Sequence, residues 1–558
     1  MAADTVPTER NEPNRAARSA RKAPRESGRL VAGRSRRNIM KRLSDAPADR
    51  LPGLPARFRR NVFSNYATTA STVIVNIVAI PLLARGLGDT RFGIWVLVGS
   101  VLLYLELLEF GFGTATVKCV AESYAKGDTE RVRRTLATSF WVLSVPGLTA
   151  LAIGAVAAGV FPTVFDIPPE AVGETRVLLL LLAFNTAVSI PSDTFGGAMI
   201  ALQRYDLLNA TLVVVSLIQL VAWAIVLHFG GSLVALAVPT LAVGLGGQLA
   251  RYLIVRQLLS GASLSPKYFD RTLVRSFSSL SVWFSLREIA QVVTHRLDTV
   301  VVGALIGVPA AAIYAVGQKL AFLVDRLIQP ATSTFFPHAA TLAEKGDDDG
   351  LRASVTTSTR ITFAITAPLC LILVLLAKPL LRSWVGEDYV EAAAVVRYLA
   401  AAILVKAFTR PGLMTLWGTG RVRTSALLLV GEGVLNLGIS VILVRGVGIE
   451  GVAIGTLTAA LVIELGILLP YVCRALRLPL WPYLAAIARA HLPATTASAM
   501  LGWVIVSRGI SGPIESGLAA ALIGITYLGV FAATGLTREE RSRLLGFVRR
   551  SHPAGGQP

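Results

Sequence analysis

Residues 287–298 read REIAQVVTHRLD and bring two arginines, a histidine, a glutamate and an aspartate between two apolar runs. Ionisable side chains are costly within a bilayer, and those that occur there face the protein interior or a water-filled cavity. At 100° per residue, four polar residues share one side of a helix, namely Arg287, Gln291, Thr294 and Asp298. A planar guanidinium can bind an anionic group through paired hydrogen bonds, and a buried carboxylate can bind a proton or a sodium ion. The stretch therefore predicts a polar helix face turned toward the bundle interior or a wet cavity.

Similar polar rows and charged residues occur in other apolar stretches. The candidates for contact with a substrate are Arg287, Arg410, Lys406, Asn65, Thr69, Thr72, Asn76, Gln291 and Gln318. The candidates for coupling to protons or sodium are Glu106, Asp325, Glu432 and Asp298. The alternative for each residue is that acidic and basic side chains pair across helices and only stabilise the bundle. No catalytic residue, metal-ligand cluster or cofactor motif is predicted.

Composition places these residues in a membrane protein. Of 558 residues, 53% are hydrophobic and only 16% are charged, with a mean hydropathy of +0.61. Soluble domains carry about 25% charged residues, and about 20 apolar residues span the hydrocarbon of a bilayer. We therefore predict an all-α polytopic membrane protein with about fourteen spans. They cover roughly 63–84, 92–112, 136–160, 173–195, 206–228, 232–256, 276–302, 311–336, 354–378, 392–417, 424–445, 451–473, 492–508 and 515–535.

The distribution of basic residues predicts the orientation. Residues 1–60 hold 16 Lys and Arg against 6 Asp and Glu, and they read as a disordered tail beside anionic lipid. Short loops on the same side of the membrane as this tail carry most of the remaining Lys and Arg. Because positive loops stay inside, both termini are predicted to be cytoplasmic, in the inner membrane.

An internal repeat divides the apolar part. Gly88 and Trp95 align with Gly307 and Tyr314 at one common spacing in the chain, and Gln219 aligns with Asn436 at nearly the same spacing. Parallel repeats predict two six-helix bundles related by a pseudo-twofold axis, with a substrate site between them. The expected parts are a basic tail 1–60, bundles 61–258 and 276–475, a linker 259–275, two further helices 476–535 and a tail 536–558.

Three stretches carry a family resemblance: NYATTASTVIVNIVAIPLLARGLGDTRFGIWVL, EFGFGTATVKCVAESYAKGDTERVRRTL and GTGRVRTSALLLVGEGVLNLGISVILVRGVGIEGVAIGT. Over about residues 60–480 the chain resembles the polysaccharide transporters, or Wzx-type flippases, of the multidrug/oligosaccharidyl-lipid/polysaccharide exporter superfamily. The resemblance implies a MATE-like two-bundle fold and a polyprenyl-pyrophosphate-linked glycan as cargo, an O-antigen or exopolysaccharide unit. It also implies membrane lipids, polysaccharide polymerase and chain-length proteins as partners, and no nucleic acid.

Two other functions stay open. A multidrug or cation antiporter of the same superfamily is one, although the first span has Asn65 and Asn76 where many such antiporters have an aspartate. A membrane-embedded polymerase or glycosyltransferase is the other. Such an enzyme would need a large outer loop, and the longest here, FPTVFDIPPEAVG, is short. The sequence therefore favours a transporter over an enzyme.

Overall fold

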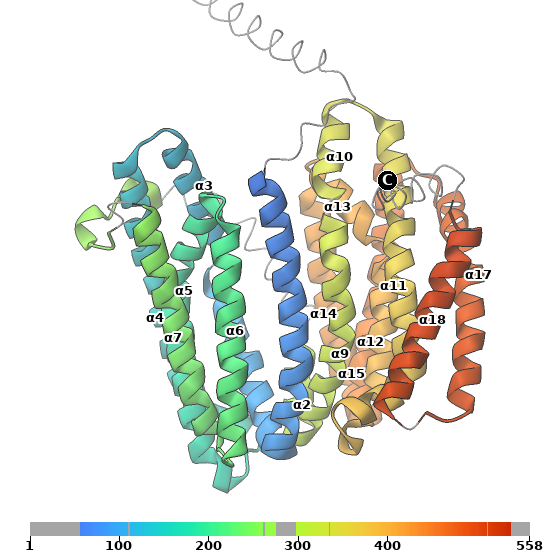
Figure 1. The fold of residues 1–558 in the computed structure, drawn as a ribbon, viewed down its shortest axis with the longest axis horizontal. Coiled ribbons are helices and arrows are strands. Elements are labelled where there is room, and N and C mark those ends of the chain that lie inside the picture. The colour runs from blue at the N-terminus through green and yellow to red at the C-terminus, as the bar shows by residue number, and fades with distance from the viewer. Residues whose placement is uncertain are drawn as a thin grey trace, which may run out of the picture. The chain divides into compact units, whose positions relative to one another are not determined.

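The computed structural model describes residues 56–109, 112–259, 263–274, 297–333, 335–510 and 512–536, with side chains from Ser64 onward. The chain divides into two units, Met1–Phe63 and Ser64–Pro558, and all of the described side chains belong to the second. In the described ranges the regular elements are helices (Figure 1). They are α2 (Ala56–Glu106), η1 (Leu107–Glu109), α3 (Phe112–Ala125), α4 (Thr129–Val164), α5 (Pro169–Ala201), α6 (Tyr205–His228), α7 (Leu233–Leu258), η2 (Pro266–Tyr268), α9 (Val308–Ser333), α10 (Phe335–Glu344), α11 (Asp348–Trp384), η3 (Glu387–Tyr389), α12 (Ala392–Lys406), α13 (Arg410–Gly418), α14 (Val422–Val447), α15 (Ile449–Ala460), the π-helix η4 (Leu461–Leu468), α16 (Leu469–Ala475), α17 (Leu480–Ser507) and α18 (Pro513–Thr534).

These helices confirm a multi-pass, all-helical membrane protein. Among the described residues, ten helices are long and apolar enough to cross a membrane, or eleven if the bent pair α12 and α13 is one span. One of the ten, Ser64–Glu109, covers most of the two predicted spans 63–84 and 92–112, and the helix breaks between them at Gly88, whose φ is 72°. The predicted span 276–302 lies mostly outside the described residues, and α17 is not among the ten. The count of fourteen therefore stays a prediction.

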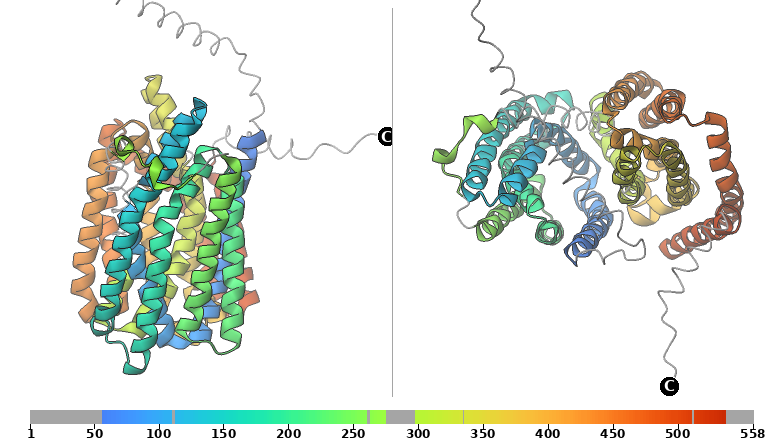
Figure 2. Two further views of the ribbon diagram at one scale, coloured as in Figure 1. Left: turned by 90° about the vertical axis from the view of Figure 1, so that its left-hand side faces the viewer. Right: turned by 90° about the horizontal axis from the view of Figure 1, so that it is seen from above.

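Helices α3 to α7 pack on one another (Figures 1 and 2). The tightest contact joins α4 and α5, where α4 presents a buried stripe of small residues: Gly147, Ala150, Gly154 and Ala158. A Cβ at Gly154 would lie only 2.3 Å from the Cβ of Ala183 on α5. Small residues let helix backbones approach closely in lipid, where no hydrophobic effect drives helices together.

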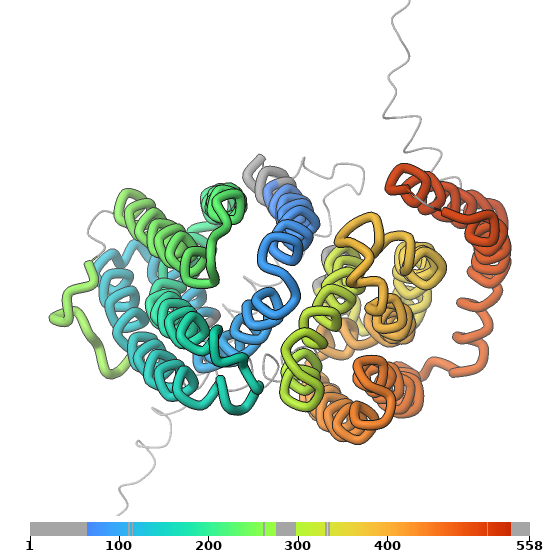
Figure 3. Tube along the Cα trace, turned by 90° about the horizontal axis from the view of Figure 1, so that it is seen from below, coloured from blue at the N-terminus to red at the C-terminus, as the bar shows by residue number. Residues whose placement is uncertain are grey.

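Helices α9 to α18 form a second set of contacts. Helix α11 packs against α9, α12, α17 and α18, and α14 packs against α15. The two last helices, α17 and α18, lie at the rim of this set (Figure 3). The predicted domain boundaries stay predictions, since the contacts within each set do not test them.

A helix-start signal recurs at the spacing of the internal repeat. Gly127 and Gly346 have positive φ values of 71° and 68°, a backbone conformation that glycine adopts at little cost. The next residue in each case, Asp128 or Asp347, caps a long helix by accepting a hydrogen bond from the backbone nitrogen three residues later, at 2.9 and 2.8 Å. The two motifs are as far apart in the chain as Gly88 and Gly307. The repeat seen in the sequence therefore extends to the start of these two helices.

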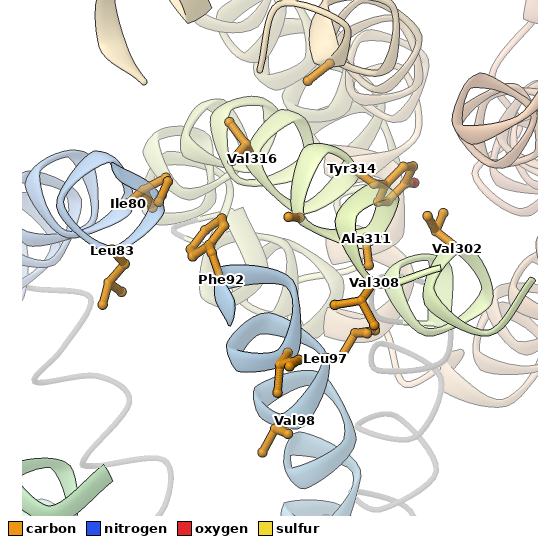
Figure 4. Packing of buried hydrophobic residues seen from close by; sticks show 14 of the residues in the cluster. Ile80, Leu83, Phe92, Leu97, Val98, Val302, Val308, Ala311, Tyr314 and Val316 are labelled. Atoms are coloured by element: carbon orange, nitrogen blue, oxygen red, sulfur yellow. The ribbon is translucent and has the colours of Figure 1, made fainter. Parts of the chain in front are cut away.

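Helix α2 contacts the second set of helices at the end predicted to be outside (Figure 4). Phe92 and Leu97 are buried in one apolar cluster with Val302, Val308 and Tyr314. A Cβ at Gly93 would lie 2.3 Å from the carbonyl oxygen of Val308. The two repeats are therefore in backbone contact at this end. The Tyr389 hydroxyl reinforces the contact, since it donates a hydrogen bond to the Asp89 carboxylate at 2.8 Å.

The predicted linker between the repeats is bound to the first one. The Trp141 indole of α4 donates a hydrogen bond to the Leu264 carbonyl at 2.8 Å. The Arg133 guanidinium donates one to the Tyr268 hydroxyl at 3.2 Å, which lowers the pKa of that hydroxyl. These contacts attach residues 263–274 to the end of α4 that is predicted to be cytoplasmic.

Candidate functional site

The Asp298 carboxylate is buried where four helical segments meet. Asp298 lies in the segment 297–305 and is 2% exposed. Its Oδ2 accepts hydrogen bonds from the Tyr314 hydroxyl on α9 at 2.9 Å and from the Thr456 hydroxyl on α15 at 3.0 Å. Its Oδ1 accepts one from the Asn436 amide on α14 at 3.0 Å. The sequence predicted the buried acid, and the structure adds its partners.

Around Asp298, the Thr456 and Ser440 hydroxyls make more close contacts with other oxygen atoms than they have protons to donate. The Thr456 hydroxyl oxygen lies 3.0 Å from Asp298 Oδ2, 3.2 Å from Asn436 Oδ1 and 3.3 Å from the Val452 carbonyl. The Ser440 hydroxyl oxygen lies 3.1 Å from Asn436 Oδ1 and 3.3 Å from the Val452 carbonyl. Each hydroxyl has one proton to donate, so several of these contacts lack one. We name Asp298, Asn436, Ser440, Thr456 and the Val452 carbonyl the oxygen cluster.

Two ion pairs lie next along α12 and α13. Lys406 Nζ is 2.8 Å from Glu432 Oε1 on α14, with side chains 9% and 1% exposed. Arg410 pairs with Asp325 on α9, with side chains 18% and 27% exposed. Both side chains of the first pair are thus buried, whereas both side chains of the second pair are partly exposed. Of the two pairs, only Arg410–Asp325 leaves its cationic side chain partly exposed.

Two irregularities in the helices position these charges. Helix α12 ends at Lys406 and α13 begins at Arg410, and the axes differ by 43°. Facing this break, the buried Glu464 accepts a hydrogen bond from the Thr409 hydroxyl. Glu464 lies in the π-helix η4, and π-helical turns within α-helices are frequent at functional sites. We name the pairs Lys406–Glu432 and Arg410–Asp325, together with Glu464, the charge cluster.

The predicted polar row on α2 lies at the helix surface. Asn65 is exposed, and Thr69, Thr72 and Asn76 are half-buried. The Thr69 hydroxyl and the Asn76 amide donate to backbone carbonyls one turn earlier, at 3.0 and 2.8 Å. Asn65 Oδ1 accepts from the Asn209 amide of α6 at 2.6 Å. These bonds use only part of the hydrogen-bonding capacity of the row, and its contact with a substrate stays a prediction.

The remaining substrate candidates fall in different places. Arg287 and Gln291 lie outside the described residues. Lys406 and Gln318 are buried within the second set of helices, where Gln318 Oε1 accepts a hydrogen bond at 3.2 Å from the Thr299 hydroxyl. A direct contact of either residue with substrate requires a change of conformation, and these roles stay predictions.

Glu106 is separate from the other ion-coupling candidates. It is exposed near the end of α2, and its negative charge acts on Asp193 of α5. Arg251 of α7 lies 3.8 Å from the same Asp193 carboxylate. Sequence reasoning missed Asp193, Arg251 and Glu464. Glu464 had a clear signal, because it is a single acid within the apolar run LTAALVIELGILLP.

Residues 58–342, more than half of the chain, match the family described as polysaccharide biosynthesis protein. The chain belongs to the polysaccharide biosynthesis protein family. One curated relative of this chain is the "uncharacterized membrane protein EpsK" of Bacillus subtilis (strain 168). The two are 20% identical over 389 residues, which cover 69% of this chain and 77% of that protein. The "uncharacterized membrane protein MJ1068" of Methanocaldococcus jannaschii is 22% identical over 206 residues, 37% of this chain and 41% of that protein.

Two solved structures share the fold of this polysaccharide biosynthesis protein. One is an inward-facing multidrug resistance MATE family transporter of the MOP superfamily, with a TM-score of 0.63 and 17% identity over 73% of this chain and 95% of that one. The other is the lipid II flippase MurJ in an inward closed conformation, with a TM-score of 0.63 and 14% identity over 85% and 98%. The resemblance predicted from the sequence is confirmed.

Proposed function

We propose that this member of the polysaccharide biosynthesis protein family moves a polyprenyl-pyrophosphate-linked oligosaccharide across the inner membrane by alternating access. The cargo is an O-antigen or exopolysaccharide repeat unit, and the chain acts as a transporter, not an enzyme. The family match over residues 58–342 carries the proposal. A fold shared with a protein named lipid II flippase supports it. Both termini are cytoplasmic in this proposal, and a polymerase and chain-length proteins act on the delivered unit.

The pyrophosphate is bound by arginine. The Arg410 guanidinium is partly exposed and pairs with Asp325, so a diphosphate can replace that carboxylate through the same donors. Arg287 is assigned the same role from its sequence position. The half-buried hydroxyls and amides of the α2 row bind sugar hydroxyls.

The oxygen cluster binds sodium as the coupling ion. One carboxylate among neutral oxygens gives a single negative charge, which a monovalent cation balances. The surrounding carbonyl, amide and hydroxyl oxygens are hard ligands, and the contacts that lack protons are satisfied by a cation in their midst. Binding draws α14, α15 and the segment 297–305 together, which gives the ion a means to favour one conformation.

The test is a flipping assay. Proteoliposomes hold the purified chain and a fluorescent polyprenyl-pyrophosphate disaccharide, and an impermeant quencher reports the fraction in each leaflet. We expect transfer that depends on the protein and on a sodium gradient. Transfer equal to that of protein-free liposomes would contradict the proposal.

A multidrug antiporter is the second candidate, because the MATE transporter matches the fold with the same TM-score. Efflux of a cationic dye from the same liposomes, with no transfer of the glycolipid, would favour it.

Sodium binding is measured separately from transport, as the rise in melting temperature when sodium chloride replaces choline chloride. Asp298→Asn should remove that rise, and Glu391→Gln, on an exposed residue, should keep it.

A further inference from the structure

Among the described residues, the charge cluster holds one more carboxylate than it holds cations. Lys406 balances Glu432, and Arg410 balances Asp325. Glu464 is 4% exposed and is the fifth member of this set. A buried carboxylate that bears a charge is strongly disfavoured unless a cation balances it. Protonation of Glu464 makes the side chain neutral and removes the need for a third cation.

The hydroxyl beside Glu464 suits both charge states. Thr409 Oγ1 contacts Glu464 Oε2 and also lies 3.1 Å from the Lys406 carbonyl oxygen. A hydroxyl can donate only one hydrogen bond, but it can accept others. With Glu464 ionised, the Thr409 hydroxyl donates to Glu464, and the Lys406 carbonyl keeps the hydrogen bond from the Thr409 backbone nitrogen at 3.2 Å. With Glu464 protonated, Glu464 donates to Thr409, and Thr409 donates to the Lys406 carbonyl. Neither state leaves a polar group of this trio without a partner.

We propose that Glu464 is a proton-binding site, separate from the oxygen cluster, and that it exchanges its proton as the transporter changes conformation. The binding of the proton stands on the cluster itself. The exchange during transport rests on the proposed function.

The groups facing Glu464 link its proton to the substrate arginine. Glu432 faces it from α14, Lys406 from α12 and Arg410 from α13, and the charge of each acts on Glu464. Asp325 lies beyond Arg410, and Asp298 is within range of the charge of Lys406. When Glu464 loses its proton, Lys406 and Arg410 gain a second anionic neighbour. The Arg410–Asp325 pair weakens, and this pair is the one with the exposed edge.

Infrared spectroscopy of the full-length chain in lipid nanodiscs tests the site at pH 7. A protonated carboxylic acid has a carbonyl stretch that a carboxylate lacks, so we expect the wild type to show this band. We expect Glu464→Gln to reduce this band by the contribution of one acid. Glu391→Gln, which changes an exposed glutamate at the start of α12, should leave it unchanged. Thr409→Val keeps the shape of the side chain but removes the hydroxyl, so it should shift the band and not remove it.

Two results would overturn the proposal. One is an unchanged band in a monodisperse Glu464→Gln variant. The other is loss of the band in Glu432→Gln with no loss in Glu464→Gln, which would move the proton to Glu432. If Glu464→Gln does not fold, Glu464→Asp and Thr409→Val replace it. A band that shifts in neither variant counts against the site.

A further comparison separates this site from the proposed function. Asp298→Asn should lose the sodium-dependent rise in melting temperature and keep the carboxylic acid band, and Glu464→Gln should do the reverse. Neither measurement uses a glycan, so a failed flipping assay leaves the proton site standing. In active proteoliposomes, Glu464→Gln should lose the acceleration of transfer by a proton gradient and keep the acceleration by a sodium gradient. Equal loss of both would overturn the role in exchange.

Discussion

The contact between α2 and α9 depends on the absence of a side chain at Gly93. The Val308 carbonyl oxygen would lie 2.3 Å from a Cβ there, and Val308 Cγ1 would lie at 2.7 Å. Gly99, six residues later on the same helix, has open space around the corresponding point. Gly93→Ala therefore adds one methyl group inside the contact, and Gly99→Ala adds the same group outside it.

The size of the effect follows from these distances. Ordinary contact for a Cβ begins at 3.4 Å, so the two backbones must separate by about 1 Å to admit the methyl group. Overpacking of this kind costs typically about 1–3 kcal/mol. The cost falls on the conformation in which α2 and α9 touch, and a conformation with these ends apart escapes it. The ratio of the two populations should therefore change about 5- to 150-fold.

Spin labels at the outer ends of the repeats can measure this shift. Cys119, Cys370 and Cys473 are replaced first, and Glu170 and Glu391, both exposed, are changed to cysteine for labelling. Electron–electron double resonance then gives the distribution of distances between the labels. Gly93→Ala should enrich the longer distances, and Gly99→Ala should match the parent.

The outcome that refutes this reasoning is an identical distance distribution for the two variants. It would mean that the contact at Gly93 does not select the conformation. A fall in folded protein for Gly93→Ala alone, with no new distance, would mean that the contact stabilises the fold and not one state of it.

Three further predictions concern other parts of the chain. Lys406→Met should cost about 3–5 kcal/mol of unfolding free energy because Glu432 is left buried, and adding Glu432→Gln should recover most of it, as measured by denaturant unfolding in micelles. Arg410→Lys should lower the rate of glycolipid transfer while the melting temperature stays near that of the wild type, because the pair is partly exposed and the planar fork is lost. Deletion of residues 1–50 should leave transfer in proteoliposomes intact, since a basic tail adds no core; loss of transfer in a well-folded, membrane-inserted variant would give the tail a specific role.

The sequence predicted the helices well because hydrophobicity along one helix is a local property. The predicted span 136–160 lies inside α4, Thr129–Val164, and 354–378 lies inside α11, Asp348–Trp384. Both helices begin several residues before the predicted span. Hydropathy reports only the part in lipid, whereas the helix begins at its capping aspartate. The motifs Gly127–Asp128 and Gly346–Asp347 held that information in advance.

The spacing of polar residues along the sequence could not predict the contacts between helices. Helical spacing identified Lys406 and Glu432 as buried charges but did not indicate that they are 2.8 Å apart. The predicted span 311–336 contains both Gln318 and Asp325, yet the first is buried and the second is partly exposed. Which side of a helix faces a neighbour depends on the rotation of the helix. Packing against every other helix sets that rotation.

The two repeats share a backbone frame but differ in where they carry charge. Gly88 and Gly307 both have positive φ at equivalent junctions, as do Gly127 and Gly346. At the spacings of the repeat, the counterpart of Asp325 is the acidic Glu106, but the counterparts of Asp298 and Glu464 are Ala79 and Gly247. The two proposed ion sites, the oxygen cluster and Glu464, both lie in the second repeat, whereas Glu106 and the Asp193–Arg251 pair lie in the first. A cation or proton bound at the two proposed sites acts first on the shape of the second repeat. Its effect must reach the first repeat through the surfaces that join them, and the backbone contact between Gly93 and Val308 is one such surface.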